Sequence, residues 1–214
     1  MNPFITANTA AASPGLVPEI QLYLATEITP LWRSCEKFLQ RENIPPPFWA
    51  LAWPGGQALS RYILDHPETV RGKRVLDFAS GSGLVALACK KAGAVAVTAN
   101  DVDPMAIVAT SLNATLNGQE LNVLHDNLIG RALPEVDVIT AGDFCYEWPM
   151  AGYAMEWLRR LVGEGKTVLF ADPGRPHAPL GGFIELFRIA VPTTRDVEDS
   201  ETKSTGVFRL LADE

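Results

Sequence analysis

A glycine-rich segment and two acids carry the clearest chemical signal in the chain. The segment reads Asp77-x-Ala79-x-Gly81-x-Gly83 and directly follows a short apolar run. Glycines in such a position let the backbone approach a ligand closely and set the N-terminus of the next helix against it. The second acid, Asp101, ends the next apolar run, where a carboxylate can accept hydrogen bonds from both hydroxyls of a ribose. The pattern predicts a nucleoside site.

Two kinds of nucleoside ligand fit this segment. Gly81-x-Gly83-x-x-Ala86 satisfies the dinucleotide fingerprint, so a nicotinamide-dinucleotide oxidoreductase is one interpretation. The carboxylate of Asp77 opposes it, because an acid in the phosphate loop would repel the two negative charges of a pyrophosphate. A cationic ligand without phosphate would be attracted instead. S-adenosylmethionine is such a ligand, so the sequence favours it as the cofactor.

Strands that alternate with helices must position these residues. Five short apolar runs have the character of buried strands: 74–78, 95–99, 122–124, 136–140 and 167–170. Helical patterns lie at 54–64, 84–91, 104–117 and 153–162. This alternation predicts a parallel sheet with helices on both faces. Asp126 and Asn127 follow the third run, where we expect them to meet the adenine edge of the ligand.

The two ends of the chain differ from this pattern. Residues 1–15 are small and polar and predict a flexible tail. Residues 16–66 predict a helical extension, with Pro30 interrupting the helical pattern of 17–40. At the C-terminus we expect a short helix at 183–188 and then two strands, 190–197 and 205–211, as an antiparallel hairpin. The expected fold class is α/β, with a Rossmann-like, doubly wound, seven-stranded sheet in three α/β/α layers. Residues 16–214 would form one domain.

The composition limits the classes of protein to consider. Of 214 residues, 47% are hydrophobic and 20% charged, as in soluble globular proteins. The net charge of −7 would repel a long phosphate backbone, so no nucleic acid is expected as a partner. The sequence has no apolar stretch of membrane-spanning length and no secretory signal pattern. We expect a monomeric protein of the cytoplasm that does not bind membranes.

Cysteine and histidine spacing gives no sign of a metal site. Cys35, Cys89 and Cys145 have no CxxC spacing, and the three histidines are isolated in the sequence. A disulfide framework and a zinc site are therefore not expected. Cys145 has no activating neighbour in the sequence, so we expect an inert thiol.

Longer motifs resemble a known family of enzymes. Asp77-Phe-Ala-Ser-Gly-Ser-Gly83 is similar to motif I of the class I S-adenosylmethionine-dependent methyltransferases, whose last strand is reversed. A closer resemblance, from about residue 16 onward, is to the lysine methyltransferases that modify the β-subunit of electron transfer flavoprotein. It rests on Phe48-Trp-Ala-Leu-Ala-Trp-Pro-Gly-Gly-Gln-Ala-Leu-Ser-Arg-Tyr62, Thr98-Ala-Asn-Asp-Val-Asp-Pro104 and Gly142-Asp-Phe-Cys-Tyr146.

The resemblance implies roles on the methyl-donor side. Trp53 resembles the tryptophan near the methyl donor, and Ala79, Ser80 and Gly81 resemble the segment along its methionine moiety. Asp101 resembles the ribose ligand. The sequence departs from the superfamily at Ala79, where many members have glycine. Because alanine is small, we expect a tighter loop that still binds the donor.

The resemblance also implies an acceptor site. Asp143 and Tyr146 match the Asp-x-x-Tyr/Phe element that borders the acceptor-lysine channel, and Gly142 before them belongs with the cofactor-binding residues. We expect Asp143 to orient the incoming amine and not to act as a general base, because a carboxylate stabilises the protonated amine. The implied activity is methyl transfer to a lysine of a protein. A small-molecule amine methyltransferase with a nicotinamide-like acceptor, the oxidoreductase, and a binding module without catalysis are the alternatives.

Overall fold

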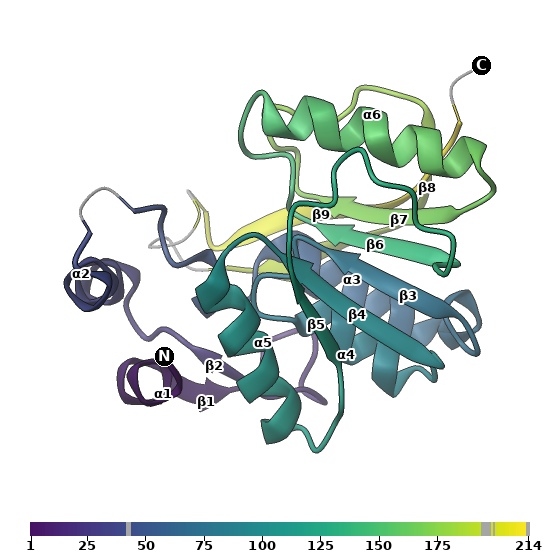
Figure 1. Ribbon diagram of the computed structural model, residues 1–214. Helices are drawn as coiled ribbons and strands as arrows, with labels where there is room; N and C mark the ends of the chain where they lie inside the picture. Colours follow the sequence, from purple (N-terminus) through teal and green to yellow (C-terminus); the bar gives the residue numbers. More distant parts are fainter. Residues whose placement is uncertain (42–43, 194–197, 199, 213–214) are drawn as a thin grey trace.

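The computed structural model describes residues 1–41, 44–193, 198 and 200–212, and within these a seven-stranded sheet has the order β5-β4-β3-β6-β7-β9-β8 (Figure 1). Its strands are β3 (Arg74–Phe78), β4 (Ala96–Asp101), β5 (Asn122–His125), β6 (Val138–Gly142), β7 (Thr167–Asp172), β8 (Phe183–Pro192) and β9 (Thr202–Leu210). Strands β5, β4, β3, β6 and β7 are parallel, and β9 and β8 are antiparallel. The expected fold class, with its C-terminal hairpin, is confirmed.

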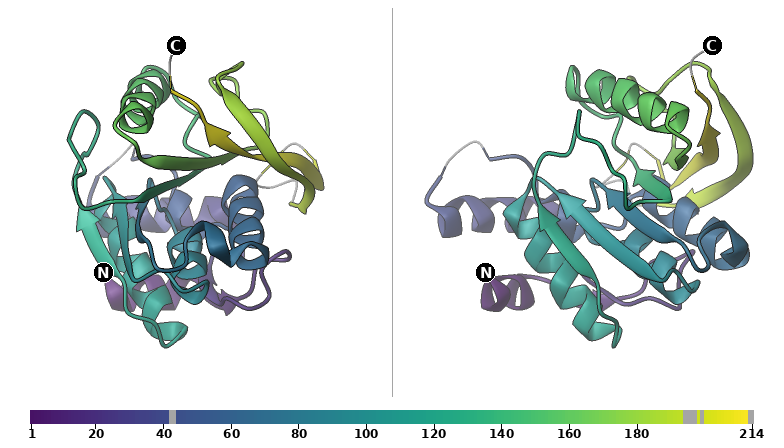
Figure 2. Two further views of the ribbon diagram at one scale, coloured as in Figure 1. Left: turned by 90° about the vertical axis from the view of Figure 1, so that its right-hand side faces the viewer. Right: turned by 45° about the vertical axis from the view of Figure 1, so that its right-hand side comes forward.

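Helices cover both faces of the sheet (Figures 1 and 2). Their bounds are α3 (Pro54–Asp65), α4 (Leu84–Lys91), α5 (Pro104–Leu116) and α6 (Met150–Gly163). Successive strand residues point to opposite faces. Accordingly Val75 packs in the core cluster formed with α3 and α4, while Leu76 packs with α6. Because the parallel strands share a direction, the loops after β3, β4, β6 and β7 meet at one edge of the sheet.

The N-terminal segment is more ordered than the expected flexible tail. Helix α1 (Asn2–Asn8) buries Ile5 completely in a core cluster with residues of α5, and β1 (Ala10–Ala12) pairs antiparallel with β2 (Leu22–Leu24). The sequence shows little sign of these elements, because Ile5 is one apolar residue within a run of small ones. The expected break at Pro30 was wrong, because within 17–40, all of which the structure describes, the only helix is α2 (Ile28–Leu39), and Pro30 lies in its first turn, as proline can.

Short elements complete the connections. Two 3₁₀ turns, η1 (Phe48–Ala50) and η2 (Pro67–Thr69), flank α3 on either side. The helix expected at 183–188 was wrong, because these residues belong to β8 and pair with β9 along its length. Residues 194–197 of the strand expected at 190–197 lie outside the described residues. In the part of the chain that the structure describes, no helix is both long and apolar enough to cross a membrane.

Candidate active site

The glycine loop after β3 has an unusual backbone. Ala79, Gly81 and Gly83 all have positive φ, of 54°, 52° and 77°. A side chain on Gly83 would come within 2.6 Å of Thr110 on α5, so only glycine fits there. A side chain on Gly81 would meet nothing closer than the Phe48 carbonyl at 4.0 Å. The loop therefore leaves space beside Gly81, which suits the close approach of a ligand.

Asp101 lies at the end of β4 against this loop. Its carboxylate accepts hydrogen bonds from the backbone N–H groups of Gly81 (2.8 Å) and Asp103 (2.9 Å). Burial raises the pKa of Asp101. Asp103 accepts from the N–H of Met105 and caps α5. Capping of α5 thus falls to Asp103, and Asp101 lies at the glycine loop.

Asp77 is buried and bonded within the protein. One of its oxygens accepts from the Ala86 N–H at 3.1 Å and the other from the Thr140 hydroxyl at 2.8 Å, and the residue is only 1% exposed. Burial raises the pKa of Asp77 to about 7, although both hydrogen bonds lower it. The expectation of direct contact between this carboxylate and a cationic ligand disagrees with this arrangement, because the side chain ties β3 to β6 and α4.

The residues after β5 are held beside Asp101. Asp101 is the register partner of His125, and the amide of buried Asn100 donates to the carbonyls of Leu124 and Asp126. Asp126 forms a 2.7 Å ion pair with Arg131. The side-chain oxygen of Asn127 accepts from the N–H of Ile129. The backbone of this turn is thus fixed next to the glycine loop, where the sequence predicts an adenine contact.

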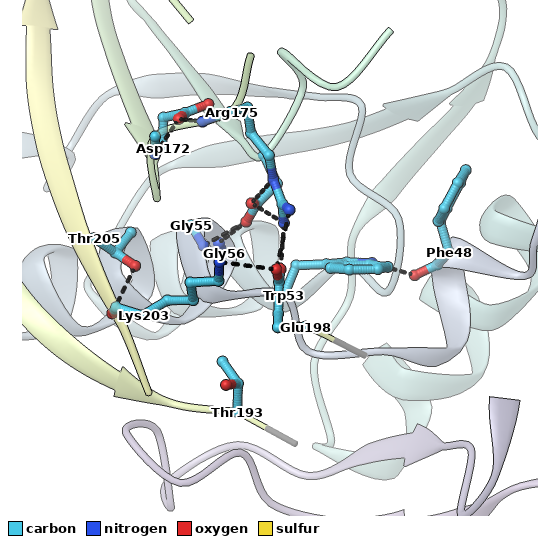
Figure 3. Close-up of polar contacts among 12 residues, drawn as sticks. Phe48, Trp53, Gly55, Gly56, Asp172, Arg175, Thr193, Glu198, Lys203 and Thr205 are labelled. Atoms are coloured by element: carbon cyan, nitrogen blue, oxygen red, sulfur yellow. Dashed lines mark hydrogen bonds and ion pairs between the residues drawn. The ribbon is translucent and has the colours of Figure 1, made fainter. Parts of the chain in front are cut away.

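An aromatic cluster connects the glycine loop with the loop after β6. The indole N–H of Trp53 donates to the Phe48 carbonyl at 2.9 Å (Figure 3). The ring of Phe48 lies 5.7 Å from that of Trp53 and 5.2 Å from that of Tyr146. Burial and the charge of Asp101 raise the pKa of the Tyr146 phenol, so it stays neutral. Phe48, which sequence reasoning did not single out, therefore joins the two predicted halves of the site.

Asp143 is fixed by a helix from a distant part of the chain. It has a φ of 55°, and one carboxylate oxygen accepts from the N–H groups of Gly55 and Gly56 in the first turn of α3. A negative charge is stabilised at a helix N-terminus. Gly142 allows this approach, because a side chain on it would come within 3.0 Å of the Gly56 nitrogen.

Arg175 completes this part of the site, and sequence reasoning missed it. Its guanidinium donates to the second oxygen of Asp143 at 2.9 and 3.2 Å and to Glu198 at 2.6 and 3.2 Å. It also lies over the ring of Trp53, 5.5 Å from the centroid (Figure 3). Burial raises the pKa of Asp143 to about 6, while the charge of Arg175 opposes that rise. The only sequence signal was the position of Arg175 three residues after the last residue of a strand, Asp172.

Asp172 and Cys145 lie next to this cluster. Asp172 accepts from the N–H groups of Gly174 (2.7 Å) and Arg175 (2.6 Å) through one oxygen. Its other oxygen is buried and has no hydrogen-bond partner within the described ranges. Burial raises the pKa of the Cys145 thiol to about 12. A thiol that stays protonated is a poor nucleophile, in agreement with the expectation that Cys145 is inert.

Comparisons with known proteins define the class. Residues 57–142 match the family model of the ribosomal protein L11 methyltransferase. The ribosomal protein L11 methylase of Lactobacillus delbrueckii superposes with a TM-score of 0.51 at 20% identity, over 72% of this chain and 77% of that one. Magnesium protoporphyrin IX methyltransferase of Synechocystis, with bound S-adenosylmethionine, gives 0.52 at 13% identity, over 70% and 74%. With a glycine loop and an acid at the next strand end, this fold defines a class I S-adenosylmethionine-dependent methyltransferase.

Relatives of higher identity define the family. Electron transfer flavoprotein beta subunit lysine methyltransferase of Mus musculus is 38% identical over 97% of this chain and 83% of its own length. The protein of the same name from Xenopus laevis is 44% identical, over 80% of this chain and 70% of its own length. This chain belongs to the family of the electron transfer flavoprotein beta subunit lysine methyltransferases.

The residues present fit S-adenosylmethionine, the cofactor of this class. The loop leaves space beside Gly81, and the carboxylate of Asp101 borders it. The Ser80 hydroxyl is buried without a hydrogen-bond partner among the described residues, so it can bind a polar group of a ligand. A carboxylate in this position suits the hydroxyls of a ribose.

Proposed function

We propose that this enzyme methylates the side-chain amine of a lysine in a protein, and that the acceptor is the β-subunit of electron transfer flavoprotein. The observation that carries the proposal is the aromatic cluster of Phe48, Trp53 and Tyr146, which links the glycine loop to the buried acid Asp143. The names of the relatives support the acceptor.

On the donor side, the proposed roles follow the sequence prediction with one change. Asp101 binds the ribose, and Ala79, Ser80 and Gly81 line the methionine moiety. Trp53 lies beside the transferred methyl group. These roles are supported by the space at Gly81 and by the partly buried carboxylate at the loop. The change concerns Asp77, for which we propose an indirect role in holding the loop, since its oxygens are bonded within the protein.

Two other predicted contacts flank the donor. Asp126 and Asn127 meet the adenine edge, in the turn that Asn100 fixes beside Asp101. Gly142 lets β6 approach the first turn of α3 at the methyl end of the donor.

On the acceptor side, Asp143 and Tyr146 orient the lysine. S-adenosylmethionine, when bound, supplies an electrophilic methyl group, and transfer to an amine is an in-line displacement. The protein must therefore bring the amine into line, an effect that can lower a barrier by about 7–11 kcal/mol. The amine must also be neutral, although free lysine has a pKa near ~10.4. Burial of the amine beside the positively charged sulfonium of the donor disfavours its charged form.

The test compares wild type with Asp143→Asn, which keeps an oxygen for the N–H groups of α3. Purified electron transfer flavoprotein is incubated with labelled donor, and label on lysine is located by mass spectrometry. We expect wild type to label the β-subunit and Asp143→Asn to lose at least about 100-fold in rate, with donor affinity by calorimetry within about twofold of wild type.

Three results would contradict this proposal. Loss of donor affinity in Asp143→Asn would place Asp143 on the donor side. Label on a small amine in place of the protein would favour the small-molecule methyltransferase. Binding of a nicotinamide dinucleotide without binding of the methyl donor would favour the oxidoreductase.

We further propose that the enzyme works as a cytoplasmic monomer, without nucleic acid or membrane. The net charge of −7 supports the absence of nucleic acid. Three free, buried cysteines are consistent with a reducing compartment.

A further inference from the structure

Arg175 lies between three acids beside the proposed acceptor site, namely Asp143, Asp172 and Glu198. Its own backbone N–H donates to Asp172 at 2.6 Å, which fixes the loop after β7. Its guanidinium donates through Nε and one terminal nitrogen to a single oxygen of Asp143 and through both terminal nitrogens to Glu198. The side chain is only 18% exposed. An arginine held at both ends in this way has little conformational freedom.

The carboxylate of Asp143 is therefore oriented from two sides. Gly55 and Gly56 bind one oxygen, and Arg175 binds the other. Each oxygen accepts two hydrogen bonds, so the position and the plane of the carboxylate are determined. An in-line attack by a lysine amine requires surroundings of fixed position, because small misplacements cost large factors in rate.

The charge of Arg175 has a second consequence. An uncompensated buried carboxylate would stabilise the ammonium form of an incoming lysine, and an ammonium has no lone pair with which to attack. A guanidinium within hydrogen-bond distance of Asp143 balances that charge. Glu198 and Asp172 add negative charge beside Arg175. The positive charge of Lys203, 3.8 Å from Glu198, offsets part of it.

We propose that Arg175 is a positioning residue for methyl transfer. It holds Asp143 in place and balances its charge beside the acceptor amine, and Glu198 holds the guanidinium in place from the segment before β9 (Figure 3). This inference rests on the proposed function. It predicts loss of activity when Arg175 is removed. If Arg175 merely occupied the place of the acceptor lysine and had to leave, its removal would increase activity.

The test uses full-length Arg175→Gln, Arg175→Ala and Glu198→Gln with electron transfer flavoprotein as acceptor. For Arg175→Gln we expect kcat to fall about 10–100-fold, with less than about a threefold change in the KM of the acceptor and in donor affinity. Added guanidinium, far below denaturing concentrations, should restore part of kcat in Arg175→Ala. For Glu198→Gln we expect kcat to fall as well, but by a smaller factor. Arg188→Gln, which removes an arginine from an exposed pair with Glu185, is the matched control and should match wild type.

Each other outcome is decisive. Wild-type or higher kcat in Arg175→Gln overturns the inference. So does loss of donor affinity, which would mean that Arg175 maintains the donor site. Lost kcat that guanidinium does not restore would mean a purely structural role and overturns it too. If wild type itself labels no protein, the proposed function fails and the inference fails with it. An active wild type beside an equally active Arg175→Gln removes the inference alone.

Discussion

Carboxylates provide most of the polar chemistry of this enzyme, and their surroundings separate their roles. Asp77 is bonded within the protein through both oxygens, whereas Asp101 borders the open space of the glycine loop. Asp143 lies at a helix N-terminus with an arginine partner. In the proposed function, these three acids at neighbouring strands therefore have different roles: Asp77 supports the sheet, Asp101 binds the nucleoside and Asp143 acts at the amine.

The ribose role of Asp101 leads to a prediction. Replacing it by alanine removes hydrogen bonds between a charged group and the donor, each of which contributes about 1.5–3 kcal/mol. We expect Asp101→Ala to weaken S-adenosylmethionine binding about 10–100-fold by calorimetry. Glu156→Gln, which removes one exposed charge from α6, is the control and should bind as wild type. An unchanged affinity in Asp101→Ala would show that the ribose lies elsewhere.

Residue types and spacing could predict part of this site. The place of Asp101 at the glycine loop could be predicted, because Asp101 ends an apolar run after a glycine segment. Asp103 precedes a helix-opening proline, which marks it as a cap. Arg175 and Glu198 could not be paired from the sequence, because only the folded sheet brings them together across 23 residues. The burial of Asp77 was equally hidden, since its partners are on β6 and α4.

At the scale of elements, the first turn of α3 is the most constrained part of the site. A side chain on Gly55 would come within 2.5 Å of an Asp143 oxygen and 2.7 Å of the Ala171 carbonyl. A side chain on the neighbouring Gly56 would meet nothing within 4 Å. Close packing therefore requires glycine at position 55 but not at position 56.

This contrast gives a matched pair of variants. We expect Gly55→Ala to lower the free energy of unfolding by about 1–3 kcal/mol, as overpacking does, and to reduce methyl transfer by displacing Asp143. We expect Gly56→Ala to be neutral or to stabilise by about 0.5–1 kcal/mol, because alanine favours the helix. Urea unfolding and a methyl-transfer assay measure both. Equal effects of the two substitutions would contradict the packing described at Gly55.

The same scale shows which elements the sequence could predict. Strand β3 and helix α4 begin and end as expected, because an apolar run, a glycine turn and a closing glycine bound them. The start of strand β8 was wrongly predicted as a helix, because its apolar residues fit the helical and the strand period equally well. Pairing with β9 makes this segment a strand. Strand β1 has three alanines and no strand signal of its own.

At the scale of the whole molecule, buried acids make folding depend on pH. Burial raises the pKa of Asp77 to about 7 in the folded protein, whereas an unfolded aspartate has a pKa near ~3.9. The folded state therefore binds this proton more tightly than the unfolded state does. Its contribution to stability is complete below the unfolded pKa and is lost as the pH rises through about 7.

Asp77→Asn tests this linkage. The amide can still bond to Thr140 and Ala86 if the threonine hydroxyl turns to accept. As the pH rises from about 5 to about 8, we expect the free energy of unfolding of wild type to fall relative to that of the variant by at least about 1 kcal/mol. Urea unfolding across that range measures the difference. Parallel stability curves for the two proteins would show that Asp77 does not carry this proton.

The bond between the first turn of α3 and Asp143 sets a lower limit on the size of a working enzyme. A chain trimmed to begin at β3 would retain every strand of the seven-stranded sheet and the whole glycine loop. It would nevertheless lack Trp53 and the two amides that hold Asp143, 88 residues further along. If the proposed roles hold, such a fragment would keep the nucleoside half of the catalyst and lose the amine half. Designers who graft this activity onto another scaffold must therefore transplant the leading helix together with the sheet.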